Sequence, residues 1–131
     1  MIGIGTYPAH PSALKNMVGL LASRMSPVPV SQDAPVDRPN TFITVDRVGG
    51  SETAHGLIST PLFVYQCYAL TTGAAETLAE TLLAELKSAQ FTQYGDAQFI
   101  NFSLSGSPQN FPDPAISSHR RWQMTGVFAI N

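Results

Sequence analysis

Charged residues are scarce in this chain, and cysteine is almost absent. Asp, Glu, Lys and Arg make up only 12% of the 131 residues, against a usual share of about 25%. So little charge indicates that neighbouring subunits cover part of the surface. The seven Lys and Arg residues form no run, and the formal net charge is -2, so we expect no direct nucleic-acid binding. A single cysteine, Cys67, excludes an internal disulfide and lies in an apolar run, where a buried side chain is expected.

Long apolar runs and targeting signals are missing as well. No window approaches the roughly 18 continuous apolar residues of a membrane span, and no basic stretch followed by an apolar one marks a secretion signal near Met1. We therefore expect a soluble, non-secreted product of the cytoplasm with no membrane partner. The length suits one domain, so we expect a single domain over residues 1–131.

Two segments carry apolar residues at helical spacing. The first runs from Pro11 to Met25, and the second from Ala74 to Ala89, where leucines and alanines share one face and glutamates lie elsewhere. Glu76 lies close to the start of the second segment, where a negative charge favours a helix. These patterns predict two amphipathic helices.

Four segments have the composition and alternation of strands. Thr41–Val48 is rich in β-branched residues and is expected to end at Gly49-Gly50, and Leu62–Leu70 suits a central strand buried on both faces. Ala97–Leu104 and Arg120–Ile130 follow, the last of them clearly amphipathic.

Three segments are expected to lie outside regular structure: a proline-rich arm over 26–40, a polar loop over 49–61 and a long loop over 105–119. The resulting order is α-β-β-α-β-β. It predicts an α+β domain in which two helices pack on one face of a roughly four-stranded, mainly antiparallel sheet.

The residues with chemical potential form no recognisable active site. His10, His55 and His119 lie in predicted termini or loops without the short spacings of zinc ligands, which favours solvated histidines. The stretch Ser51-Glu52-Thr53-Ala54-His55 offers a hydroxyl, a carboxylate and an imidazole, but consecutive loop residues rarely present the geometry of a triad. A polar loop that contacts a partner is the favoured interpretation. We predict no catalytic, cofactor-binding or metal-binding residue, and no enzyme.

Several charges and glycines suggest contact surfaces instead. Gly49-Gly50 lacks the context of a phosphate-binding loop and is interpreted as a strand-end turn that needs positive φ. The charges on predicted strands belong either to a solvated sheet face or to ion pairs between subunits. The candidate interface residues are Asp46, Arg47, Gly49, Gly50, Glu52, His55, His119, Arg120 and Arg121.

Three stretches give the chain a resemblance to a known family. They are Phe42-Ile-Thr-Val-Asp-Arg-Val-Gly-Gly50, then Leu62-Phe-Val-Tyr-Gln-Cys-Tyr-Ala69 leading into Ala74-Ala-Glu-Thr-Leu-Ala-Glu80, and Arg120-Arg-Trp-Gln-Met-Thr-Gly-Val-Phe128. Together they cover most of residues 40–130. The pattern resembles tail terminator proteins of long-tailed (siphovirus-type) bacteriophages, particularly those that infect actinobacteria. The proline-rich segment Ser26–Asn40 departs from that pattern.

The resemblance implies a lambda-like terminator fold, a small sheet with helices on one side. It also implies a structural virion protein at the head-to-tail joint, forming a hexameric ring that caps the tail tube. Its partners would be further copies of itself, the major tail tube protein and a head-closure or tail-completion protein, with DNA passing through the ring and no cofactor.

Two alternatives remain open at this point. One is another neck or tail-completion protein, which differs mainly in the partner it binds. The other is a small-ligand-binding or enzymatic domain that uses Tyr65, Tyr68 and Trp122 as a pocket, although aromatic residues in strands more often fill the core.

Overall fold

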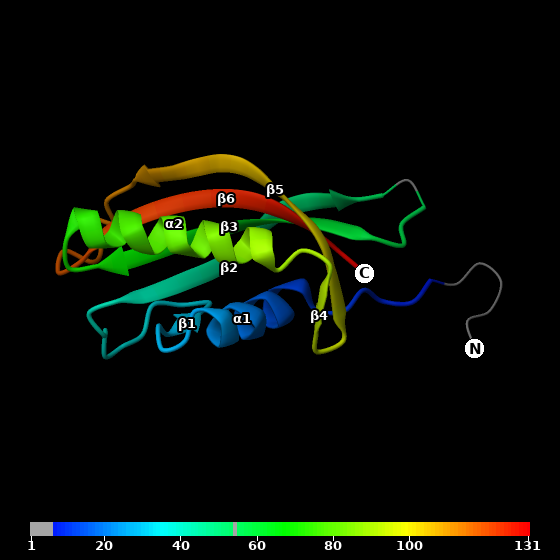
Figure 1. Ribbon diagram of the computed structural model, residues 1–131, viewed down its shortest axis with the longest axis horizontal. Helices are drawn as coiled ribbons and strands as arrows, with labels where there is room; N and C mark the ends of the chain where they lie inside the picture. The colour runs from blue at the N-terminus through cyan, green and yellow to red at the C-terminus, as the bar shows by residue number, and fades with distance from the viewer. Residues whose placement is uncertain (1–6, 54) are drawn as a thin grey trace.

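The computed structural model describes residues 7–53 and 55–131, which form two helices and six strands (Figure 1). In chain order these elements are α1 (Ala13–Arg24), β1 (Val30–Ser31), β2 (Phe42–Glu52), β3 (Ser59–Ala69), α2 (Thr72–Ser88), β4 (Thr92–Tyr94), β5 (Ala97–Asn110) and β6 (Arg120–Ile130). None of the helices among these residues is both long and apolar enough to cross a membrane.

The expected four-stranded sheet and the order α-β-β-α-β-β are wrong. The six strands form one mixed sheet in the order β1-β2-β3-β6-β5-β4. The pair β1 and β2 is parallel, and the other neighbouring strands are antiparallel. The two strands that the sequence did not predict have two and three residues, too few to show an alternating pattern.

Both helices begin at side-chain caps. The Ser12 hydroxyl accepts a hydrogen bond from the Lys15 backbone N–H at the start of α1, and the Thr71 hydroxyl accepts one from Ala74 at the start of α2. Such caps satisfy backbone donors that the first helical turn leaves free. The predicted helices are therefore confirmed, with their ends moved by one to two residues.

One face of the sheet and both helices enclose the main hydrophobic core. The side chains of this face alternate along the strands with those of the other face, as the pleat requires. The helices contribute Met17, Leu20, Leu21, Leu78, Leu82 and Leu86, and the strands contribute Ile43, Val45, Phe63, Tyr65, Cys67, Phe99, Met124, Phe128 and Ile130.

The sheet curls around the helices. Helix α1 contacts β1 and β2 on one side of the sheet and β4 on the other, and Figure 1 shows β5 bending down to bring β4 beside α1. The Asn16 side chain donates to the Asp96 carboxylate across this contact at 2.8 Å. A Cβ on Gly19 would lie 2.6 Å from the Tyr94 ring, so glycine allows α1 and β4 to approach closely.

The predicted polar loop over 49–61 is largely strand. Strands β2 and β3 continue as a hairpin to Glu52 and Ser59, with a β-bulge between Arg47 and Gly49. Gly50 has a φ of 115°, and a Cβ there would lie 2.3 Å from the Thr60 carbonyl oxygen. Positive φ was expected at the double glycine because the strand was expected to end there. Gly50 has the positive φ, but β2 continues through it to Glu52 and is distorted in this region.

The predicted loop over 105–119 is also shorter than expected, because β5 extends to Asn110. Its glycine, serine and proline residues resemble those of a loop, but an outer strand tolerates Pro108, whose missing N–H needs no partner at a free edge. Residues 26–40 do form mainly irregular structure, although Val30 and Ser31 pair with β2.

Candidate functional site

The sheet face opposite the helices is covered at one end only. There Phe42, Tyr68 and Arg121 lie side by side on β2, β3 and β6, and the segment 111–119 folds over them. Phe42 and Tyr68 stack with ring centroids 4.4 Å apart, and Ile116 packs on both as a second, small hydrophobic cluster.

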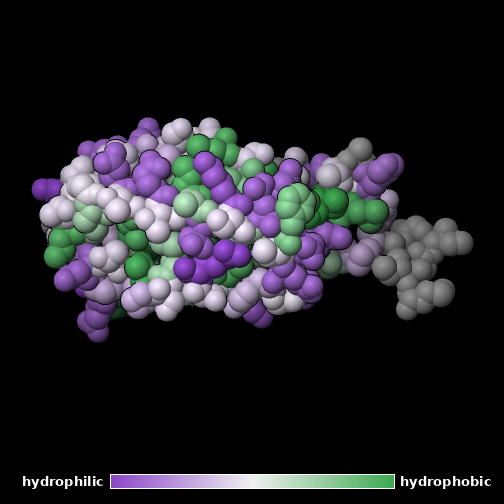
Figure 2. Space-filling view, in the orientation of Figure 1, coloured by the Kyte–Doolittle hydropathy of each residue, from purple (hydrophilic) through white to green (hydrophobic). Residues whose placement is uncertain are grey.

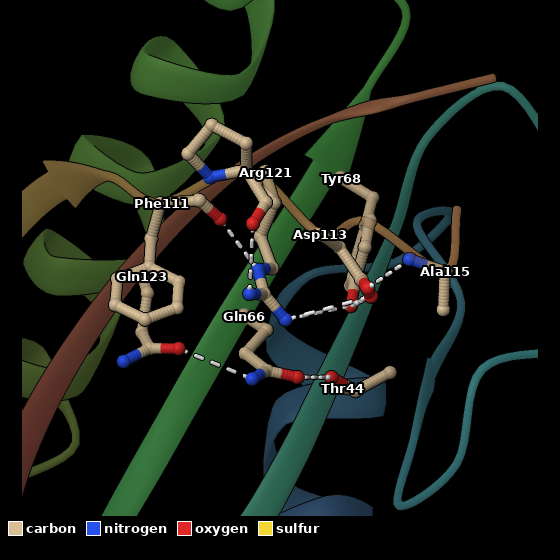
Figure 3. Close-up of polar contacts among 9 residues, drawn as sticks. Thr44, Gln66, Tyr68, Phe111, Asp113, Ala115, Arg121 and Gln123 are labelled. Carbon is tan, nitrogen blue, oxygen red and sulfur yellow. Dashed lines mark hydrogen bonds and ion pairs between the residues drawn. The ribbon is translucent and has the colours of Figure 1, made fainter. Parts of the chain in front are cut away.

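Arg121 holds this segment in place (Figure 3). Its Nε donates to the Phe111 carbonyl at 2.6 Å, and one terminal nitrogen donates to the Pro112 carbonyl at 3.3 Å. The other terminal nitrogen lies 3.5 Å from the Asp113 carboxylate and 3.5 Å from the Tyr68 hydroxyl. The guanidinium also lies 4.9 Å from the centre of the Phe111 ring, within cation–π range.

The Asp113 carboxylate is the acidic centre of this network. It accepts hydrogen bonds from the Tyr68 hydroxyl at 2.9 Å and from the Ala115 backbone N–H at 3.0 Å. Burial raises the pKa of Asp113, but these two hydrogen bonds and the charges of Arg121 and Arg38 outweigh it and lower the pKa overall. For Tyr68, loss of solvent is the main cause of a raised pKa. The pair is therefore an ionised carboxylate and a protonated phenol at neutral pH.

His119 was expected to be a solvated loop residue, and that prediction is wrong. The side chain is only 8% exposed. Its Nε2 donates to the Pro39 carbonyl at 2.8 Å, and Nδ1 lies 2.8 Å from the Ser118 hydroxyl. The ring also meets the Phe42 ring edge-on, with centroids 5.3 Å apart. His119 thus joins the segment 111–119 to the proline-rich segment.

Arg121 was expected either on a solvated face or in ion pairs between subunits. The solvated face is wrong, because the side chain is buried within the chain. It is 8% exposed, and all its polar contacts are within the chain. The network around Arg121 engages the Phe111 and Pro112 carbonyls, the Tyr68 hydroxyl and the Asp113 carboxylate. Its role is to fix the segment 111–119 on the sheet.

The rest of this sheet face is uncovered and almost uncharged. Beside the network, the Thr44 hydroxyl donates to Gln66, and the Gln66 amide donates to Gln123, across three strands (Figure 3). The next positions on the same face are Asp46, Val64 and Thr125. An antiparallel sheet that faces water usually carries charged or strongly polar side chains, so this face is unusual in its lack of charge.

The other predicted interface residues are exposed: Asp46, Arg47, Gly49, Gly50, Glu52, His55 and Arg120. The hydroxyl–carboxylate–imidazole set is not assembled. Instead, Ser51 hydrogen-bonds Thr60, and Glu52 pairs with the imidazole of His10. A partner-contacting role for this hairpin stays a prediction.

The suggested aromatic pocket is absent from the described residues. Tyr65 lies on the helix-covered face and is fully buried, whereas Tyr68 lies on the opposite face. The Trp122 Nε1 is buried without a hydrogen-bond partner. A mainly apolar hollow of about 340 Å³ lies open to solvent between the end of α1, residues 25–28 and α2, where its ionised groups, Arg24 and Glu85, pair with each other.

The edge strands β1 and β4 are short, so they leave most of the outer edges of their long neighbours β2 and β5 unpaired. On one side β1 covers only Ile43 and Thr44 of the 11-residue β2. On the other, β4 covers only Ala97 to Phe99 of the 14-residue β5. The sequence could not reveal these edges, because strand order depends on contacts between distant segments.

Comparisons with known proteins add no family. Neither a scan against protein families nor a search of curated proteins found a match for the chain. Across residues 7–53 and 55–131, no group of three or more His, Cys, Asp or Glu side chains is placed to hold a metal ion.

Proposed function

We propose that this chain is the subunit of a closed ring at the head-to-tail joint of a long-tailed bacteriophage, where the ring caps the tail tube and ends its growth. The observation that carries the proposal is the pair of different, largely unpaired sheet sides formed by β2 and β5. A ring needs two unlike, complementary surfaces on each subunit, joined by a rotation that closes.

The distribution of charge supports contact with other copies. Only 12% of the residues are charged, and the uncovered sheet face carries Asp46 at its edge with glutamine, threonine and valine further in. Large uncharged surfaces are unfavourable in a solitary soluble protein. Neighbouring subunits and axial partners would cover them in an assembled particle.

The two ends of the sheet suit axial contacts. The tip of the β2–β3 hairpin lies at one end, and the segment 111–119 lies at the other (Figure 1). In this proposal, one end matches the major tail tube protein and the other a head-closure or tail-completion protein. Growth stops because the outer end does not match a further tube subunit. DNA passes through the ring without specific contacts, and no step requires a catalytic residue.

Electron microscopy of the purified protein tests the ring directly. We expect negative-stain images at rising protein concentration to show rings of uniform diameter with a central channel, and we expect six subunits from native mass spectrometry. A protein that stays monomeric, or that forms only two-fold dimers, would contradict the proposal.

A further inference from the structure

We propose that one ring contact joins the β5 side of one copy to the β2 side of the next through side chains. The β5 flank comprises Glu76, Glu80, Phe91 and Leu104, and the β2 flank comprises Arg47 and Val48. The carboxylates would meet Arg47, and Leu104 would meet Val48, with Phe91 further along the same flank. This inference rests on the proposed ring and names the residues that would close it.

Two contacts of α2 place its glutamates on the β5 flank. Glu85 pairs with Arg24 of α1, so that side of α2 faces α1. Just after the helix, the Gln90 side chain accepts a hydrogen bond from the Phe102 N–H of β5. Successive residues of a helix are about 100° apart, so Glu76 and Glu80 lie on the opposite side of α2 from Glu85. That side is the one towards β5. Both are exposed and four residues apart, a spacing at which like charges repel.

Phe91 is the unusual feature of this flank. Its side chain is 75% exposed, and its φ of 61° is a conformation that favours glycine. The Phe91 N–H donates to the Ile100 carbonyl at 2.9 Å, which holds the residue beside β5. Further along β5, Leu104 is 40% exposed. Figure 2 shows hydrophobic groups between hydrophilic ones along the upper side of the molecule, where Figure 1 shows the arch of β5.

The opposite flank supplies a matching surface. Arg47 is exposed and takes part in none of the ion pairs formed among the described residues. Val48, beside it at the β-bulge, is 54% exposed. A cation beside an apolar side chain complements the two carboxylates and Leu104.

The backbone at both edges is partly blocked, so side chains must make this contact. The Asp46 carboxylate accepts the Arg47 backbone N–H at 2.8 Å on β2. On β5, Gln90 occupies the Phe102 N–H, and Pro108 has none. Such features protect strand edges from adding a further strand. A copy docked here would therefore be held by charge and apolar packing, with little main-chain pairing.

Reversal of the charges tests the contact. Arg47→Glu is expected to weaken self-association on the order of tenfold or more, because like charges would face each other across the interface. Glu76→Arg with Glu80→Arg should have the same effect. The triple variant should recover most of the lost association, because the charges match again. Lys15→Glu is the matched control: it reverses an exposed cation of α1 that belongs to neither flank and should leave association unchanged.

Sedimentation equilibrium and native mass spectrometry would measure association, with circular dichroism showing that each variant is folded. If both charge reversals weaken self-association and the triple variant restores it, this contact is supported. If the wild-type protein forms rings and Arg47→Glu forms them equally well, the ring proposal stands and this contact is wrong. If the wild-type protein is monomeric throughout, the ring proposal itself fails, and the contact fails with it.

Discussion

Replacing Arg121 by methionine should release the segment 111–119 from the sheet. Methionine keeps most of the side-chain length and apolar packing but removes the guanidinium. The Phe111 and Pro112 carbonyls would lose their charged donor, and the Asp113 carboxylate would lose its ion-pair partner. The hydrogen bond from the Tyr68 hydroxyl to Asp113 would remain.

The expected cost follows from the burial of the pair. The Arg121 and Asp113 side chains are 9% and 16% exposed, so solvent screens them little. Breaking a buried ion pair by removing one partner costs about 3–5 kcal/mol. Asp113 lies at the rim and retains two other donors, so we expect the lower end, a loss of about 3 kcal/mol in the free energy of unfolding.

Urea denaturation followed by tryptophan fluorescence measures this loss, and hydrogen exchange of residues 111–119 locates it. Arg120→Met is the control, because Arg120 is the adjacent exposed arginine, and its replacement should change stability by less than about 0.5 kcal/mol. Equal, small effects of the two substitutions on stability would refute the conclusion that Arg121 holds the segment 111–119 on the sheet.

Four further predictions concern single positions. Phe91→Gly should raise the free energy of unfolding by about 0.5–1 kcal/mol in urea titrations, since it relieves the positive φ. Gly50→Ala should lower it by about 2–3 kcal/mol, because its Cβ would strike the Thr60 carbonyl. The lowered pKa of Asp113 means that its charge stabilises the fold above about pH 4. The stability advantage over Asp113→Asn should therefore disappear as acid titrations pass below that pH. Burial raises the pKa of Cys67 to about 12, so thiol reagents at pH 8 should modify it only after denaturation.

Local patterns predicted the elements whose own residues decide their structure. Helix α2 and strand β6 have clear apolar periodicity, and the structure places them where the sequence indicated. The burial of Cys67 followed from the same kind of signal. The predicted strand Ala97–Leu104 is shorter than β5, because the serines, glycine and proline that follow Leu104 resemble a loop. A strand with a free outer edge can hold such residues.

The remaining features depend on contacts between distant segments. His119 and Arg121 look solvent-exposed in sequence, and only the folding of segment 111–119 onto the sheet buries them. The same holds for β1 and β4, which lie at the two edges of the curled sheet and both contact α1. Arg47 and Arg120 are exposed, and nothing in the sequence separated them from the buried Arg121.

Tail length tests the central claim most directly. Negative-stain microscopy would compare tails made by a phage that lacks this gene with tails made when the gene is supplied. We expect headless tails with a normal tube but overgrown, uneven length, restored to uniform length by the protein. Tails of normal length that merely fail to join heads would identify a neighbouring neck protein instead, and normal virions would contradict the structural role altogether.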